Sequence, residues 1–204
     1  MTDQQPEPES AFTLSLEALA AAPAGEAVER DLPRQTVIAI DGEGHPGSPM
    51  FRQGVRDLWR AAYAVQKVAR REGLPDSDYA MPPTEVDFAT ADRHGVWRMF
   101  FPQPDAITAD VLERAYAELA EGEKPVELHA AIVVREPERV LQTTHIGFPD
   151  ALPAALAVLE EHAAAHGLVL GPRQREVFLD DPIRVGFENA RDLVRRTIVG
   201  SAGS

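Results

Sequence analysis

The chain of 204 residues contains no cysteine, so disulfides, a thiol nucleophile and a thiolate metal site are excluded. Basic residues are also scarce, because 20 lysines and arginines stand against 33 aspartates and glutamates, which gives a formal net charge of −13. A charge of this sign repels nucleic acid and anionic membrane surfaces. We therefore expect neither nucleic acid nor a membrane as a partner.

Long hydrophobic runs are missing as well, since no stretch approaches the roughly 18 apolar residues that a membrane helix needs. The first ten residues, MTDQQPEPES, are acidic and lack the basic and apolar regions of a secretory signal. We therefore expect a cytoplasmic protein. A chain of this length can bury the core of one domain or of two small fused units.

The spacing of apolar residues predicts alternating strands and helices over residues 35–199. Residues 1–34 form an acidic, partly disordered lead-in that can add an edge strand, and residues 200–204 form a flexible tail. Strands are predicted at 35–41, 79–89, 96–101, 126–135, 139–146 and 175–180. Helices are predicted at 50–71, 109–120, 150–166 and 186–196. The hairpins between strands indicate an α+β fold.

A pattern of strand, glycine, proline and helix occurs twice, at VIAIDGEGHPGSPMF and at LQTTHIGFPDALPAAL. The echo suggests two related halves, each of which lays one helix on a small sheet. His162 and His166 lie four residues apart on the third predicted helix, but no third ligand is evident, so no metal site is predicted.

Two predicted strands carry carboxylates beside aromatic or sulfur-containing side chains. Because side chains alternate along a strand, one strand places Tyr79, Met81, Glu85 and Asp87 on one face. The other places Glu176 and Phe178 together, with Val177 turned toward the helices. Such a face suits the wall of a pocket for a flat, partly cationic ligand, and it equally suits a solvated strand. A glutamate desolvated by aromatic rings has a raised pKa and can act as a general base.

Five segments, in collinear order, resemble the GyrI-like small-molecule-binding family, and most closely its stand-alone branch. They are IDGEGHPGSPMFRQGVRDLWRAAYAVQK, DYAMPPTEVDF, FPQPDAIT, LQTTHIGFPDALPAALAVLEEH and REVFLDDPIR. The resemblance implies a GyrI-like domain over residues 35–199, built as a pseudo-twofold pair of β-α-β-β (SHS2-type) repeats. It also implies a ligand groove on the concave sheet face.

By matching positions, Tyr63, Glu85, His145 and Glu176 fall where the family has its own tyrosine, glutamates and histidine. Where the family has G-L-W-W after the strand glutamate, this chain has Val86-Asp87-Phe88, so one or both tryptophans are missing and the pocket is expected to differ in shape. The ligand-binding residues expected on this basis are Trp59, Tyr79, Met81, Asp87, Phe88, Trp97, His145 and Phe178.

Three functions remain open at this stage. The first is a protein that binds planar aromatic or cationic drug-like molecules, for sequestration, resistance or detoxification. The second, implied by the resemblance of some stand-alone members to cyclopropanoid cyclopropyl hydrolases, is a cofactor-free hydrolase that adds water to a strained ring. Its catalytic residues would be Glu176, Glu85 and Tyr63. The third is an acidic inhibitor of another protein.

Overall fold

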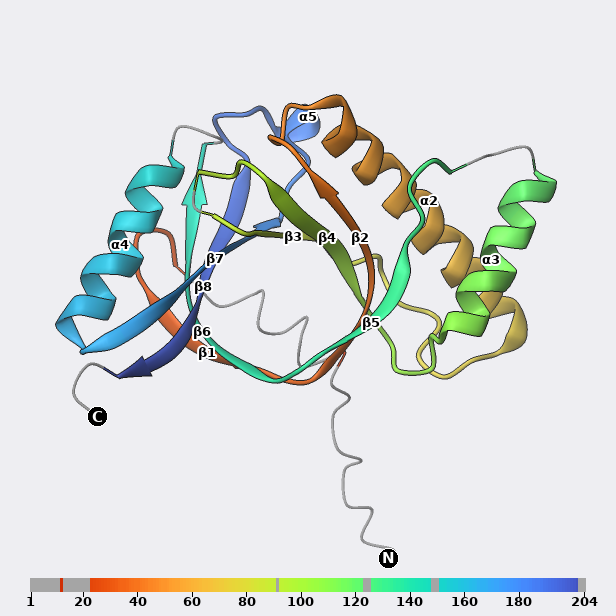
Figure 1. Cartoon of the computed structure of the whole chain (residues 1–204), viewed down its shortest axis with the longest axis horizontal. Helices are drawn as coiled ribbons and strands as arrows, with labels where there is room; N and C mark the ends of the chain where they lie inside the picture. Colours follow the sequence, from red (N-terminus) through yellow and green to blue (C-terminus); the bar gives the residue numbers. More distant parts are fainter. Residues whose placement is uncertain (1–11, 13–22, 91, 123–125, 148–150, 202–204) are drawn as a thin grey trace, which may run out of the picture.

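The computed structural model describes residue 12 and residues 23–90, 92–122, 126–147 and 151–201 of the chain. Within them, eight antiparallel strands form one sheet, and helices pack on one of its faces (Figure 1). In chain order the elements are β1 (Val28–Leu32), β2 (Gln35–Glu43), α2 (Pro49–Glu72), β3 (Thr84–Phe88), β4 (Val96–Gln103), α3 (Ala109–Glu121), β5 (Ala131–Arg135), β6 (Glu138–Ile146), α4 (Leu152–Ala165), β7 (Leu168–Phe178), α5 (Pro182–Val185) and β8 (Arg191–Ser201).

The sheet is duplicated about its centre. Its strand order is β1-β6-β8-β7-β3-β4-β2-β5. From the centre outward, one half therefore runs β3-β4-β2 and the other β7-β8-β6, with α2 and α4 in equivalent places in the chain. The predicted α+β fold with two β-α-β-β repeats is confirmed.

The sheet arches so strongly that its two edges approach each other. The edge strand β1 pairs with β6, and the edge strand β5 pairs with β2, so each half lends its leading strand to the other half. Only residues 33–34 join β1 to β2, and only residues 136–137 join β5 to β6. Each link spans at most about 11 Å, so opposite ends of the sheet must lie close together. Figure 1 shows β5, β6 and β1 meeting below the central strands.

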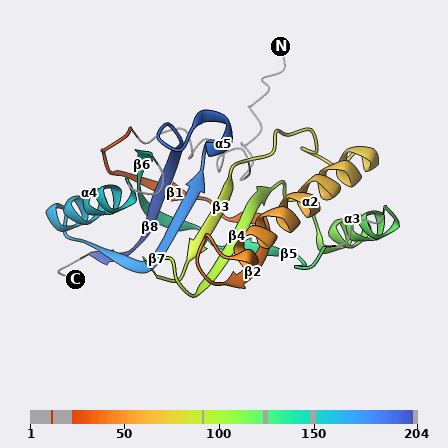
Figure 2. The same ribbon diagram turned by 90° about the horizontal axis from the view of Figure 1, so that it is seen from above.

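The two faces of this sheet have different surroundings. The helix face carries α2, which packs on β2 and β4, and α4, which packs on β6, β7 and β8. Each helix packs into its own hydrophobic cluster on the sheet. One cluster includes Leu58 of α2 and Val86 of β3, and the other includes Leu159 of α4 and Val194 of β8. In Figure 2 the two helices flank the central strands β3 and β7. The opposite face, here called the inner face, is enclosed by the arch.

Local sequence explains the position of α2. Ser48 is its N-cap, with its Oγ accepting a hydrogen bond from the backbone N–H of Phe51 at 3.2 Å, and Pro49 follows at the first helical position. Gly73 ends the helix in the left-handed conformation at φ 65°. The buried Gly54 lets the helix approach Trp97, since a Cβ at this position would lie 2.7 Å from the Trp97 ring.

Four predicted elements differ from the structure, and one of them is the strand predicted at 126–135, which begins only at Ala131. Residues 191–201 form β8 rather than a helix, because this segment pairs on both sides, with β6 and with β7. The strand at 175–180 begins earlier, at Leu168, and continues through a bulge. Residues 79–83 lie outside β3, since Pro82 and Pro83 cannot donate ladder hydrogen bonds. The sheet also takes β1 from the predicted lead-in and extends to Ser201.

Candidate functional site

A cavity of about 840 Å³ opens on the helix face over the strip that neither α2 nor α4 covers. Its floor comes from the central strands, where Thr84 of β3, Phe178 of β7 and Asp192 of β8 follow one another across the sheet. Its remaining lining residues are His45, Pro46, Gly47, Phe51, Val55, Trp59, Tyr63, Met81, Pro82, Pro83, Arg93, Leu179, Asp180, Asp181, Arg184 and Ala190.

One wall of the cavity is a stripe of α2. Phe51, Val55, Trp59 and Tyr63 are spaced four residues apart, so they lie one above another on a single side of the helix. The Trp59 ring packs edge-on against Phe101 of the core, with centroids 4.8 Å apart, which holds it in place. The Tyr63 ring lies 5.4 Å from Trp59 and remains 55% exposed, so it forms the outer rim.

The floor of the cavity contains a buried carboxyl group, that of Asp192, which is only 2% exposed. Burial raises the pKa of Asp192 to about 7, and the nearby charges of Glu176 and Asp180 add to this effect, whereas Arg93 opposes it. At neutral pH this group is therefore divided between its neutral and charged forms. A cation placed against it would favour the charged form.

A second carboxyl group, that of Glu176, lies beneath the cavity on the same face of the sheet. It is fully buried and accepts hydrogen bonds from Arg93 Nη1 at 3.2 Å and from Gln174 Nε2 at 2.7 Å. Burial raises the pKa of Glu176, and the charge of Arg93 counteracts the shift. Arg93 itself lines the cavity, so this side chain separates Glu176 from the cavity space.

His145 stands beside Asp192, because β6 and β8 pair these two residues directly. The imidazole is buried, and neither ring nitrogen has a hydrogen-bond partner among the described residues. Burial lowers the pKa of His145, and the charge of Arg93 lowers it further. The histidine is therefore a neutral neighbour of the acidic floor, one strand away from the lining residues.

The cavity brings together part of the predicted site. Trp59, Tyr63, Met81 and Phe178 line it, and Glu176 and His145 lie next to it. Sequence reasoning missed Asp192 and Arg93. Asp192 was hidden because its strand was predicted as a helix, and Arg93 because it lies in the turn between β3 and β4.

The other predicted residues lie elsewhere. Glu85 and Asp87 point to the inner face, since they alternate with Thr84, Val86 and Phe88 on β3. Their carboxylates form ion pairs with arginines there, with Arg195 Nη1 3.2 Å from Glu85 Oε2.

Three predicted aromatic residues also lie outside the cavity lining. Phe88 and Trp97 are each 1% exposed and belong to the core under α2. The Tyr79 hydroxyl donates a hydrogen bond to Gln103 Oε1 at 2.6 Å, and its ring contacts Phe12. Burial raises the pKa of Tyr79 to about 12. None of these three side chains lines the cavity.

Two further features bear on the class of site. Among the residues that the structure describes, no three His, Asp or Glu side chains gather as a metal site would require. The helices of this same part of the chain include none that is both long and apolar enough to cross a membrane.

Solved structures show the same fold. A hydrolase from Listeria innocua matches at 21% identity and a TM-score of 0.74, with 89% of this chain and 96% of that chain covered. An uncharacterized conserved protein from the same organism matches at 21% identity and a TM-score of 0.77, covering 88% and 95%. The EcmrR C-terminal domain matches at 11% identity and a TM-score of 0.53, covering 85% and 96%. No protein-family model and no curated protein matches the chain. At these identities the similarity is one of fold: the chain has the duplicated α+β fold that the resemblance to the GyrI-like family implies.

Proposed function

We propose that the cavity on the helix face binds a flat aromatic small molecule that carries a positive charge. The observation that supports this proposal is the buried Asp192 carboxyl at the floor of an aromatic-walled cavity of about 840 Å³. Pockets of this size bury most of a drug-sized ligand. The biological role would be sequestration or detoxification of such compounds.

The walls and the floor would recognise different parts of the ligand. Rings such as Trp59 and Tyr63 stack on flat aromatic systems, and their faces attract cations. Asp192 would pair with the positive group once it loses its proton. Glu176 already forms an ion pair with Arg93. It would therefore attract the ligand cation by its negative potential rather than by direct contact.

The test is a fluorescence titration with ethidium, a planar aromatic cation, beside its uncharged parent ring phenanthridine. Asp192→Asn should weaken ethidium binding about tenfold, because a charged contact is lost, and should leave phenanthridine binding nearly unchanged. Trp59→Ala should weaken both compounds. Asp110→Asn, which removes an exposed carboxylate from α3, is the control and should change neither. Equal ethidium affinity in the wild type and Asp192→Asn would contradict the proposal.

A second candidate is hydrolysis of a strained, electrophilic ring. The observation that favours it is the pair of carboxyl groups with raised pKa values, Asp192 and Glu176, at a cavity that Tyr63 borders. A hydrolase from Listeria innocua also shares the fold.

In a cyclopropane conjugated to a dienone, the water oxygen would bond to the ring CH₂ carbon as the adjacent C–C bond breaks. The electron pair of that bond moves to the carbonyl oxygen, which becomes a phenolate. A carboxylate accepts the proton of the water, and a phenol donates a proton to the phenolate.

Liquid chromatography with mass spectrometry distinguishes the two candidates. Repeated turnover of a cyclopropyl-dienone to a product heavier by one water would establish hydrolysis. Asp192→Asn should then abolish turnover, while Tyr63→Phe should lower kcat with little change in KM. Recovery of the unchanged compound would exclude this candidate and leave the binding function.

A further inference from the structure

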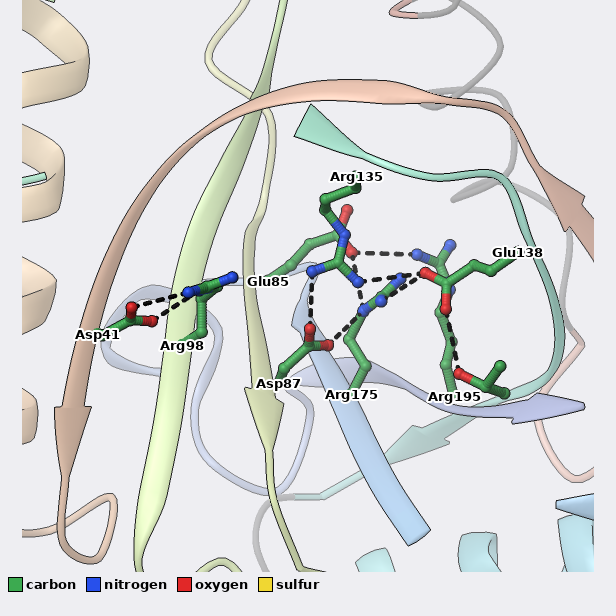
Figure 3. A network of polar contacts seen from close by, with 9 residues as sticks. Asp41, Glu85, Asp87, Arg98, Arg135, Glu138, Arg175 and Arg195 are labelled. Carbon is green, nitrogen blue, oxygen red and sulfur yellow. Dashed lines mark hydrogen bonds and ion pairs between the residues drawn. The ribbon is translucent and has the colours of Figure 1, made fainter. Parts of the chain in front are cut away.

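A network of ion pairs fills the inner face of the sheet, on the side opposite the aromatic cavity (Figure 3). The Asp87 carboxylate accepts hydrogen bonds from Arg175 Nε at 2.6 Å and from Arg135 Nη1 at 2.7 Å. Glu138 Oε1 accepts from Arg175 Nη2 at 2.6 Å and from Arg135 Nη2 at 3.2 Å. These four residues come from β3, β5, β6 and β7, so the network ties the edge strand β5, and the strand β6 next to the other edge, to the two central strands.

A small cavity of about 110 Å³ lies within this network. At roughly 30 Å³ per water molecule, its volume equals three to four waters or one small oxyanion. The cavity is lined by Asp87, Arg135, Glu138, Val140, Arg173, Arg175, Arg195 and Thr197.

Two guanidinium groups of this lining have unused hydrogen-bond donors. Arg175 is only 5% exposed, and its Nη1 has no partner among the described residues. The same is true of the buried Nε of Arg135. Both groups are held in place, because their other nitrogens bond carboxylates and because their planes lie over the Phe100 ring, at 4.4 Å for Arg135 and 5.5 Å for Arg175. A buried N–H group that is fixed in place and has no hydrogen-bond acceptor destabilises the folded state unless a bound group accepts from it.

The charges around the cavity favour an anion as this missing partner. The lining has four arginines and two carboxyl groups, those of Asp87 and Glu138, and one of the four, Arg195, also pairs with Glu85 behind the lining. The arginines therefore exceed the carboxylates by one. Arg173, the exposed member, stands within the bulge of β7 between Leu170 and Gln174. The bulge disrupts the ladder and leaves this side chain at the entrance rather than in the sheet.

We propose that this inner cavity binds a small oxyanion with the chemistry of inorganic phosphate. The oxyanion accepts hydrogen bonds from Arg135 Nε and Arg175 Nη1, and Arg173 closes the site from the solvent side. Arginine suits this task because its planar donor fork matches the oxygens of phosphate and carboxylate groups.

Protonation of Glu138 would strengthen this binding. Burial raises the pKa of Glu138 to about 7, and the charges of Asp87 and Glu85 add to the rise. The charged or polar groups around it from the packed strands are Glu85 and Asp87 of β3, Arg135 of β5, Arg175 of β7, and Arg195 and Thr197 of β8. Below about pH 7 the site loses one repelling charge, so its affinity for sulfate, whose own charge is constant over this range, should rise as the pH falls.

The experiment follows thermal unfolding and calorimetric binding with phosphate, with sulfate, and with chloride at matched ionic strength. Phosphate should raise the unfolding midpoint of the wild type and bind with measurable affinity. Arg173→Gln, an exposed position outside the ion pairs of the network, should weaken that affinity about tenfold. Arg56→Gln removes the same charge from an exposed position on α2 that lines neither cavity and is the matched control.

The variants separate a site from a general salt effect. Phosphate and sulfate stabilise many proteins because they are excluded from the surface, and this effect is the same in both variants. An oxyanion effect that Arg173→Gln loses and Arg56→Gln keeps supports the proposal. Equal stabilisation of all three proteins, or chloride acting as well as phosphate at matched ionic strength, overturns it.

Discussion

The buried carboxyl of Asp192 makes the stability of the fold depend on pH in a direction that can be worked out. In the unfolded chain this group loses its proton near the ordinary pKa of 3.8, whereas in the folded protein its pKa is about 7. Between these values the folded state binds more protons, so the free energy of unfolding falls as the pH rises. The loss is complete above about pH 7 and amounts to about 4 kcal/mol.

Asparagine at position 192 does not titrate, so the unfolding free energy of Asp192→Asn lacks this dependence on pH. The variant should therefore become more stable relative to the wild type as the pH rises. The difference in unfolding free energy should grow by about 3 kcal/mol from about pH 5 to about pH 7.5 and stay constant above it. Any constant packing cost of the amide cancels, because only the slope with pH is used.

Urea denaturation at a series of pH values measures this difference. Asp181→Asn, which removes a half-exposed carboxylate from the same cavity, is the control for the loss of a charge at this place. Parallel curves for Asp192→Asn and the wild type would refute the argument that this carboxyl is desolvated.

Two further predictions concern packing and hydrogen bonds. Gly54→Ala should destabilise the protein by about 1–2 kcal/mol, measured by urea unfolding, because the new Cβ overlaps the Trp97 ring and the helix-propensity gain offsets only part of the strain. No loss, or a gain, would show that the ring can shift. Tyr79→Phe should cost about 1–2 kcal/mol in the same assay, since it leaves the buried Gln103 Oε1 without its donor. A smaller change for this variant than for an exposed tyrosine such as Tyr63→Phe would count against that hydrogen bond.

Helices with clear end signals could be predicted closely from the sequence. The helix predicted at 50–71 is α2, Pro49–Glu72, because Ser48, Pro49 and Gly73 specify its two ends locally. Strand β8 was mistaken for a helix for an equally local reason. Its inner-face positions include Arg195, which is buried against Gln142 and Glu85, and a buried arginine breaks the apolar alternation by which a strand is recognised.

The position of the site could be predicted only in part. Helical spacing predicts that Trp59 and Tyr63 lie on one side of α2. It does not predict that this side borders a cavity, because that depends on which part of the sheet α2 and α4 leave uncovered. For Glu85 and Glu176, each strand pattern shows which neighbours share a face, but it does not show which face carries the helices. That choice depends on how the two halves pair, and it placed the two glutamates on opposite sides of the sheet.

Whether a buried carboxylate can bind a cationic ligand depends on whether an arginine of the protein already neutralises it. Glu85 meets Arg195 and Arg175 within 3.2 and 3.8 Å, so its charge is neutralised by the fold and serves to hold the arch together. Asp192 lies on the floor of an open cavity, and its raised pKa shows that Arg93 does not compensate for its burial. A buried carboxylate without a compensating positive charge destabilises the folded state. A cationic ligand that supplies this charge removes the destabilisation, and the free energy recovered adds to its binding. This unbalanced charge is the reason to place ligand recognition at Asp192 rather than at the glutamates that the strand patterns first suggested.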